Sequence, residues 1–100
     1  MNESANAMLD RLEGKSYIIG REGHIYISDP AASKQHAELS FVDGRIRIRD
    51  LGSTNGIYIL RDGERTRLTD EYVDPQQTIA IGAQKHKVET LLETIWSFTI

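Results

Sequence analysis

The sequence AELSFVDGRIRIRD, at residues 37–50, gives the clearest indication of the fold class. Apolar and polar residues alternate over residues 37–41 and again over 45–49, which is the pattern of strands that bury one face. Asp43-Gly44 lies between the two runs and is typical of a tight hairpin turn. The pattern therefore predicts an antiparallel hairpin with strands at about 37–42 and 45–50.

Further short runs of β-forming residues occur along the chain. Isoleucine outnumbers leucine, threonine is frequent and proline is scarce, a balance that favours strands over helices. Glycine, aspartate or proline separates each run from the next. The additional runs lie at residues 16–20, 25–27, 57–60, 65–68, 78–81 and 85–91. Short strands at such regular spacing predict an all-β sandwich.

The two ends of the chain are less regular. Residues 6–12 could form a helical turn, but so short a segment is marginal alone, and we assign residues 1–14 to an N-terminal tail. Residues 89–96 fit either a helix or a continuation of the last strand, and the pattern leaves both open. We predict one domain over residues 15–91, followed at 92–100 by a C-terminal extension that is a last strand or a packed tail.

The composition argues against several functional classes. A chain of 100 residues has room for one domain, and its 39% hydrophobic and 27% charged residues are those of an ordinary globular protein. The formal net charge of −3 argues against a protein whose main ligand is nucleic acid or anionic lipid. The sequence contains no cysteine, no apolar core of an export signal and no membrane-spanning run, so the expected compartment is the cytoplasm.

Residue types common in enzymes are present but poorly arranged. His24, His36 and His86 have neither metal-ligand spacing nor a helix to bring two of them onto one face, so no metal site is expected. There is no nucleophile elbow, P-loop or dinucleotide-binding glycine motif. Asp29, Ser33 and His36 are near one another in sequence, but a hydrolytic triad is recognised by its geometry. We expect a protein without catalytic activity and without a cofactor.

Three arginines raise the possibility of a nucleic-acid surface. Arg45, Arg47 and Arg49 share one face of the strand predicted at 45–50. Alternating arginines opposite a row of isoleucines are also typical of a solvated sheet face, and no aromatic residues stand between them for base stacking. The solvated face is the favoured interpretation, and no nucleic-acid or membrane partner is expected.

The predicted loops contain cationic side chains and hydrogen-bond donors. Gly20-Arg21 ends the first predicted strand, SKQH at 33–36 precedes the strand at 37–42, and LGSTNG occupies residues 51–56. Loops at one end of a sandwich lie close in space although they are far apart in sequence. Together they would supply a guanidinium, an ammonium, hydroxyls, a carboxamide and backbone N–H donors, a set suited to a phosphate monoester.

Four separated blocks, taken in order, resemble the forkhead-associated (FHA) domain. They are IIGR at 18–21, IYISDPAASKQHA at 25–37, RDLGSTNG at 49–56 and TIAIG at 78–82. The resemblance extends over about residues 15–91, and its specificity comes from the order of the blocks. It implies a β-sandwich of two mostly antiparallel sheets, with about eleven short strands and with loops at one end that bind phosphothreonine in extended peptides.

The resemblance also implies roles for individual residues around the phosphate. Arg21 matches the family arginine that pairs with the phosphate, and Ser33 matches the serine that hydrogen-bonds to it. Lys34 occupies a position where the family often has a basic residue or asparagine close to the phosphate. Thr54 matches the threonine that holds the phosphate through its hydroxyl and backbone, and Ser53 lies beside it.

Other positions would hold the peptide or shape the loops. Asn55 matches the asparagine that holds the main chain of the bound peptide, whereas Gly20, His36 and Gly56 match positions that shape the loops without touching the ligand. One departure from the family pattern is the short loop at residues 22–24, because the family usually has a longer loop there. We therefore expect the wall of the site on the arginine side to be truncated.

The sequence thus predicts a phosphothreonine-dependent binding module that acts as a signalling adaptor or regulatory domain. Its partner would be a phosphothreonine-containing protein or peptide, a Ser/Thr kinase would act indirectly by adding the phosphate, and the module would be monomeric.

The alternative is a scaffold or oligomerisation module with the FHA fold that binds independently of phosphate. It rests on Leu92, Ile95, Trp96 and Phe98, which are more apolar than a free chain end usually is. Packing of these residues on their own sandwich is the favoured interpretation.

Overall fold

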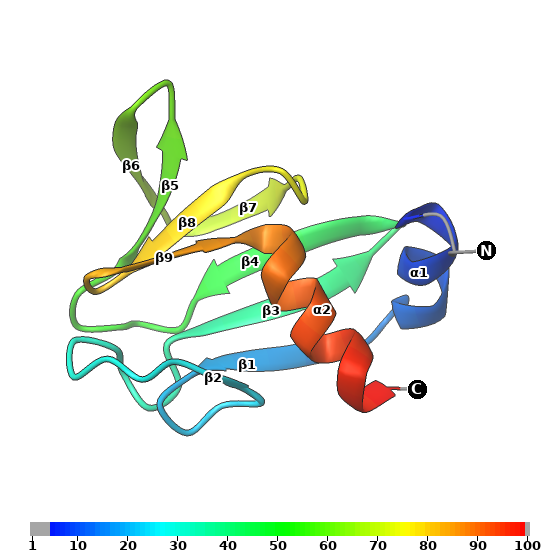
Figure 1. Cartoon of the computed structure of the whole chain (residues 1–100), viewed down its shortest axis with the longest axis horizontal. Helices are drawn as coiled ribbons and strands as arrows, with labels where there is room; N and C mark the ends of the chain where they lie inside the picture. The colour runs from blue at the N-terminus through cyan, green and yellow to red at the C-terminus, as the bar shows by residue number, and fades with distance from the viewer. Residues whose placement is uncertain (1–4, 100) are drawn as a thin grey trace.

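The computed structural model describes residues 5–99, in which two β-sheets pack face to face, α1 lies at one end of the sandwich and α2 runs along one side of it (Figure 1). The five-stranded sheet has the order β2-β1-β3-β4-β7, and the four-stranded sheet has the order β6-β5-β8-β9. The elements are α1 (Ala5–Leu12), β1 (Ser16–Gly20), β2 (Ile25–Tyr26), β3 (Ala37–Val42), β4 (Arg45–Asp50), β5 (Ile57–Arg61), β6 (Glu64–Leu68), β7 (Asp70–Val73), β8 (Thr78–Ile81), β9 (Gln84–Lys87) and α2 (Val88–Thr99).

The predicted sandwich of mostly antiparallel sheets is confirmed, with a difference in strand number. Every strand pair in residues 5–99 is antiparallel except β1 with β2. The described chain has nine strands, where the resemblance implied about eleven. β7 was not predicted from the sequence, because of its four residues only Val73 is buried. The segment between β2 and β3 is a loop, because Asp29 and Pro30 direct the chain into a turn there.

The central hairpin forms as the alternation predicts. β3 pairs with β4 from Ala37 opposite Asp50 to Val42 opposite Arg45. Asp43 and Gly44 both have positive φ, at 54° and 71°, which is the backbone of the tight turn that matches the twist of two neighbouring strands.

The alternating residues of both sheets meet in one apolar core. Leu39 and Phe41 from β3, Ile48 from β4 and Ile57 and Ile59 from β5 are fully buried. Each such side chain stabilises the fold by about 1.5–3 kcal/mol relative to an exposed one. The polar residues between them face solvent, so a shift of one residue in register would exchange the two faces.

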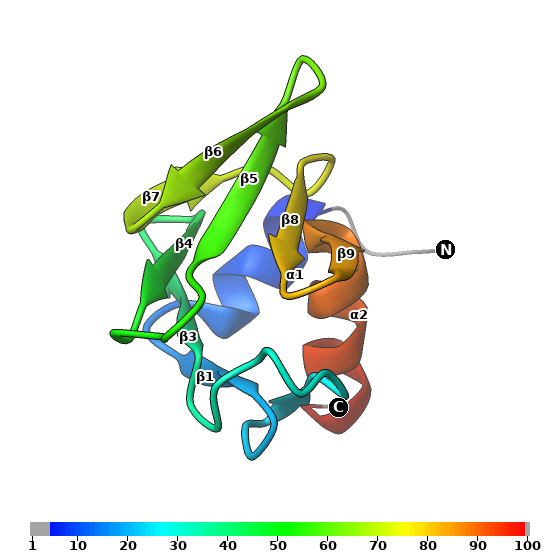
Figure 2. The same cartoon turned by 90° about the vertical axis from the view of Figure 1, so that its left-hand side faces the viewer.

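Helix α2 closes one side of the sandwich. It contacts β9, at the edge of the smaller sheet, and β2, at the edge of the larger sheet (Figure 2). The strand predicted over residues 85–91 therefore ends at Lys87, and residues 88–99 are helical instead of strand. Val88, Leu91 and Ile95 are buried, and their spacing of three and four residues places them on one helical face.

Both terminal helices pack on the sandwich. Leu92 and Trp96 of α2 are partly buried against the core of the same chain and Ile95 is buried, as the favoured interpretation expected for these three, while the side chain of Phe98 lies outside the described part of the chain. Leu12 of α1 is buried, and the guanidinium carbon of Arg11 lies 5.6 Å from the ring centroid of Trp96. Residues 5–12, assigned to a tail from the sequence, thus form a packed helix, while residues 1–4 of that assignment lie outside the described part of the chain. Neither helix in residues 5–99 combines the length and the apolar character needed to cross a lipid bilayer.

His86 makes the stability of this fold depend on pH. It pairs with buried Ile79 across the β8–β9 ladder, and its Nε2 is buried without a hydrogen-bond partner among residues 5–99. Burial lowers the pKa of His86 below the ordinary value of 6.5. The unfolded chain therefore binds a proton at a pH where the folded chain does not, so stability is complete above about pH 6.5 and falls as the pH decreases below it.

We expect the midpoint of urea unfolding to be lower at pH 5.5 than at pH 7.5, and we expect this difference to shrink in His86→Leu. The leucine variant keeps an apolar side chain on the same strand but cannot take up a proton. An equal pH effect in parent and variant would contradict the assignment to His86.

Candidate binding site at the rim of the sandwich

Four loops gather at one end of the sandwich, the end opposite α1 (left-hand side of Figure 1). They connect β1 to β2, β2 to β3, β4 to β5 and β8 to β9. All six residues predicted to bind a ligand lie in these loops, and we call them the rim site. They are Arg21, Ser33, Lys34, Ser53, Thr54 and Asn55.

The end of β1 lies directly against the loop that contains Ser33 and Lys34. A Cβ atom added to Gly20 would lie 2.3 Å from the carbonyl oxygen of Lys34, so only glycine permits this approach. The backbone N–H of Arg21 donates to the Ser33 carbonyl at 3.1 Å, and that of Glu22 donates to the Lys34 carbonyl at 3.0 Å. Arg21 and Ser33 therefore lie on the same edge of the sandwich.

The Arg21 side chain is held by a single backbone contact. Its Nε donates to the Ala32 carbonyl at 2.6 Å. The two terminal amino groups of this exposed guanidinium have no hydrogen-bond or carboxylate partner among residues 5–99. A planar fork fixed at Nε and free at both amino groups is suited to bidentate contact with an anion.

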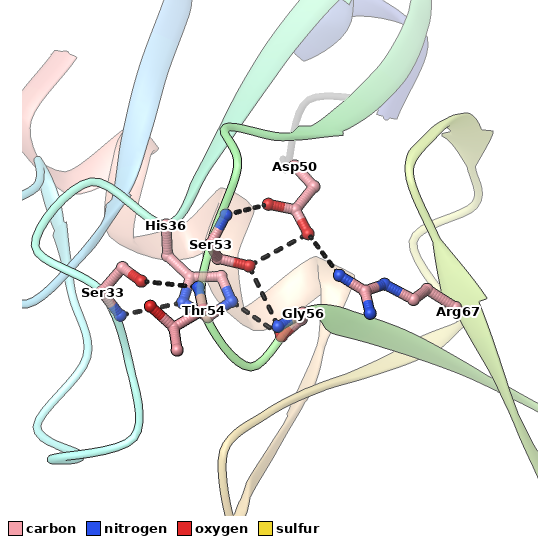
Figure 3. Close-up of polar contacts among 7 residues, drawn as sticks. All are labelled: Ser33, His36, Asp50, Ser53, Thr54, Gly56 and Arg67. Carbon is pink, nitrogen blue, oxygen red and sulfur yellow. Dashed lines mark hydrogen bonds and ion pairs between the residues drawn. The ribbon is translucent and has the colours of Figure 1, made fainter.

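The buried side chain of His36 joins two of the loops (Figure 3). Nδ1 accepts a hydrogen bond from the backbone N–H of Ser33 at 3.0 Å, which places the ring proton on Nε2. Nε2 lies 2.8 Å from the Gly56 carbonyl and therefore donates to it. One neutral imidazole thus fixes Ser33 relative to Gly56, which is the structural role expected from the sequence.

The third part of the rim site comes from the loop between β4 and β5. The backbone N–H of Thr54 points to the Ser33 hydroxyl oxygen at 3.3 Å. That oxygen accepts the bond, so the Ser33 hydroxyl proton can be donated elsewhere. Gly56 ends the loop with a φ of 77°, and the guanidinium of Arg67 packs where a Cβ atom would lie. Arg21, Ser33 and Thr54, which are far apart in sequence, are therefore brought to one rim.

Ser53 and Asn55 are oriented differently from Thr54. The Ser53 hydroxyl donates to Asp50 Oδ2 and accepts from the backbone N–H of Gly56, both at 3.0 Å, so its hydrogen-bonding capacity is used within the loop. The side-chain amide of Asn55 donates to the Ala31 carbonyl at 2.8 Å and joins the two loops from the solvent side. The structure therefore places Ser53 in a loop-supporting position and Asn55 on the exposed surface.

Two aspartates near the rim are engaged by hydrogen bonds within the loops. Asp50 accepts both bonds from Ser53 and lies 3.8 Å from Arg67. Asp29 accepts from the backbone N–H groups of Ala31 and Ala83, and these bonds hold the pKa of Asp29 below its ordinary value. Both carboxylates thus support the loops through these hydrogen bonds.

Glu22 and Lys34 form an ion pair beside Arg21. The Lys34 Nζ and a Glu22 carboxylate oxygen are 3.7 Å apart, and both side chains are about two-thirds exposed. A pair this open to water contributes about 0–1 kcal/mol, so Lys34 can exchange Glu22 for another anion at little cost. Glu22 belongs to the short loop that we expected to alter the arginine side of the site.

Sequence analysis missed Arg67 and a neighbouring cavity. Arg67 lies on the exposed strand β6, where charged residues are usual, and only its contact with Asp50 and Gly56 connects it to the rim. The cavity is about 490 Å³ in volume. It is lined by Ala31, Asn55, Tyr58, Arg65 and Gly82. Sequence alternation places Tyr58 on the outer face of β5, but it does not reveal a cavity formed by three loops and a hairpin.

The three arginines that share one face of β4 each contact a neighbouring side chain. Arg47 forms a two-bond ion pair with Asp70, Arg49 pairs with Glu38, and the Arg45 guanidinium lies 3.9 Å from the ring centroid of Tyr72. These contacts agree with the solvated-face interpretation. The described histidines, aspartates and glutamates contain no group of three arranged to hold a metal ion.

Comparison with known proteins identifies the relatives of this arrangement. The family model for the FHA domain matches residues 17–82. The FHA domain of the CT664 protein from Chlamydia trachomatis has 31% sequence identity and a TM-score of 0.61, with 73% of each chain covered. An FHA domain solved in a study of phosphothreonine-dependent FHA interactions has 25% identity, a TM-score of 0.63 and the same coverage.

A curated relative offers a likeness in sequence. It is the oxoglutarate dehydrogenase inhibitor of Corynebacterium diphtheriae, with 36% identity over 63 residues. The match covers 61% of this chain but only 42% of that protein, so the chain spans less than half of its curated relative.

The His36 bridge is expected to be important for stability. In His36→Leu the Ser33 N–H and the Gly56 carbonyl lose their buried partner, and each unsatisfied group costs about 1–3 kcal/mol, so the free energy of unfolding should fall by about 2–6 kcal/mol. Urea denaturation at pH 7.5 measures the change. The matched control is His24→Ala, whose Nδ1 also accepts a backbone N–H but on the surface, so the expected loss is below about 1 kcal/mol. Equal losses in the two variants would show that the bridge has no special role.

Proposed function

This chain belongs to the FHA domain family, and we propose that it binds phosphothreonine in extended peptides as a non-catalytic signalling module. FHA domains are known for phosphopeptide binding and are generally without catalytic activity. The observation that carries the proposal is the meeting of Arg21, Ser33 and Thr54 on one rim, with the amino groups of Arg21 left without an internal anion.

Arg21 provides the charge that distinguishes a phosphorylated ligand. A phosphate monoester carries close to two negative charges at neutral pH, and each charge-assisted hydrogen bond contributes about 1.5–3 kcal/mol. An unmodified threonine offers the same groups only a neutral hydroxyl. Phosphorylation therefore acts as the switch for binding.

Ser33, Thr54 and Lys34 complete the coordination. The Ser33 hydroxyl proton and the Thr54 hydroxyl can donate to phosphate oxygens, and Lys34 adds a mobile positive charge from the loop side. Asn55 is close enough to this group, through its contact with Ala31, to hold the main chain of the peptide. In this proposal Ser53 acts indirectly, by fixing the loop that presents Thr54.

Three findings, two on relatives and one on packing, favour this function over a phosphate-independent scaffold. One structural neighbour, at 25% identity, comes from work on phosphothreonine-dependent interactions. The apolar residues Leu92, Ile95 and Trp96, which suggested an oligomerisation surface, are in contact with the core of their own chain. The name of the curated relative, an oxoglutarate dehydrogenase inhibitor, agrees with a regulatory role.

Replacing Arg21 should reduce phosphopeptide affinity. We expect Arg21→Gln to bind a phosphothreonine peptide about tenfold to a hundredfold more weakly than the parent, because a charged hydrogen bond of about 1.5–3 kcal/mol is removed. Isothermal titration calorimetry against an oriented phosphothreonine peptide library, and against its unphosphorylated twin, provides the measurement. The unphosphorylated library should bind no variant measurably.

Arg61→Gln is the matched control for this experiment. Arg61 is also an exposed arginine, but it lies at the end of β5, pairs with Glu71 of β7 and has no hydrogen bond or ion pair with the rim site. Its removal should leave phosphopeptide affinity unchanged. Equal binding of both libraries by the parent, or an unaltered affinity in Arg21→Gln, would rule out the proposed function.

A further inference from the structure

Gly56, the last residue of the β4–β5 loop, is held from several sides. Its carbonyl accepts a hydrogen bond from His36 Nε2, and its N–H donates to the Ser53 hydroxyl. On the outer side, the guanidinium carbon of Arg67 lies 2.9 Å from the place that a Cβ atom of Gly56 would take (Figure 3). Arg67 belongs to β6, which pairs with β5 along its length, so this contact connects the end of the loop to the smaller sheet.

The same guanidinium lies beside a carboxylate at the other end of the loop. Asp50 is the last residue of β4, and one of its carboxylate oxygens is 3.8 Å from a terminal nitrogen of Arg67. The Asp50 side chain is 8% exposed, whereas the carboxylate side chains in the other ion pairs of residues 5–99 are 26–64% exposed. Because a carboxylate so shielded from water is costly to leave without its cation, Arg67 stabilises Asp50 in this position.

The location of Thr54 follows from these two anchors. Asp50 accepts the backbone N–H of Ser53 at 2.8 Å and its hydroxyl at 3.0 Å, which fixes the residue before Thr54, and Gly56 is fixed two residues after it. The direct bond from the Thr54 N–H to the Ser33 hydroxyl is 3.3 Å long. This is longer than the common N–H···O distance of about 2.9–3.0 Å, so that bond alone holds Thr54 weakly. A displacement of Asp50 or Gly56 would therefore reach Thr54.

We propose that Arg67 is a positioning residue for phosphopeptide binding, because its guanidinium braces the β4–β5 loop at Asp50 and Gly56 and so holds Thr54 opposite Ser33 before a ligand arrives. This inference rests on the proposed function and deepens it, since it assigns a role to a residue outside the rim site. Arg67 acts through the loop and not on the phosphate. Its contribution is to lower the cost of ordering the loop, which the ligand would otherwise have to offset.

Calorimetry with a peptide that has one phosphothreonine flanked by alanines tests this role. We expect Arg67→Gln to bind the peptide about 3- to 10-fold more weakly than the parent, within the range by which residues without ligand contact modulate binding. Arg67→Lys keeps a positive charge for Asp50 but lacks the planar group that packs on Gly56. The lysine variant should therefore recover part of the lost affinity.

Arg47→Gln is the matched control for the loss of an arginine–aspartate pair. Arg47 pairs with Asp70 through two hydrogen bonds on the outer face of the larger sheet and has no hydrogen bond or ion pair with the rim site. This variant should bind the peptide as the parent does. Urea unfolding of all variants gives the folded fraction of each, so a change in affinity can be separated from a change in stability.

A double-mutant cycle and a measurement on the free protein test the route through the loop. Asp50→Asn removes the charge that Arg67 faces, so Arg67→Gln should cost less affinity in that background than in the parent. Backbone amide relaxation, measured by NMR without peptide, should show larger motions at Ser53 and Thr54 in Arg67→Gln than in the parent or in Arg47→Gln. An equal loss of affinity in both backgrounds would contradict the route through Asp50.

The outcomes separate this inference from the proposed function. Phosphothreonine-dependent binding that is unchanged in Arg67→Gln would overturn the positioning role and leave the proposed function standing. Weaker binding with unchanged motion of the loop would make Arg67 a direct ligand contact and would also overturn it. Equal binding of phosphorylated and unphosphorylated peptides by the parent would overturn the proposed function and, with it, the role of Arg67 in phosphopeptide binding.

Discussion

The arrangement of the binding end depends on the hydrogen bonds of one buried residue, His36. Its backbone N–H donates to Ile19 of β1, its carbonyl accepts from Leu51, Nδ1 accepts from Ser33, and Nε2 donates to Gly56. These four bonds connect β1, the β2–β3 loop and the β4–β5 loop. Because water has no access to the ring, breaking one bond leaves a polar group without compensation. The distance between Ser33 and Thr54 is thus set from the interior and not by the exposed side chains themselves.

The distribution of charge follows the same division between interior and surface. Asp29 and Asp50 accept hydrogen bonds from loop N–H groups. These two carboxylates offset two arginines in the net charge of the chain, but in the structure they support the loops. Arg21 and Arg65 keep their charges directed to solvent at the same end of the molecule. A domain with a net charge of −3 can therefore present a locally positive rim, because local charge arrangement and not the total decides which ligand a loop cluster attracts.

The sequence was sufficient for the sandwich and for most of the rim site. Alternation over β3 and β4 determines which face is buried, and the order of the four motif blocks locates Arg21, Ser33 and Thr54. It was insufficient where tertiary contacts decide. Residues 89–96 fit both a helix and a continuation of the last strand, and only packing against β9 and β2 selects the helix. The inward turn of Ser53 depends on Asp50, and the environment of Arg65 depends on how the β5–β6 hairpin lies beside the loops.

The position of α2 also has a consequence for how copies of this domain behave in concentrated solution. The helix runs past β9 and β2, which are the last strands of their respective sheets, and so occupies the side where unpaired backbone groups could recruit a strand from a neighbouring molecule. The remaining outer strand of the smaller sheet, β6, is dense in charged side chains, which disfavours the same association. A fragment cut after Lys87 would lose this shielding and would be prone to polymerise, although every residue of the rim site would still be present.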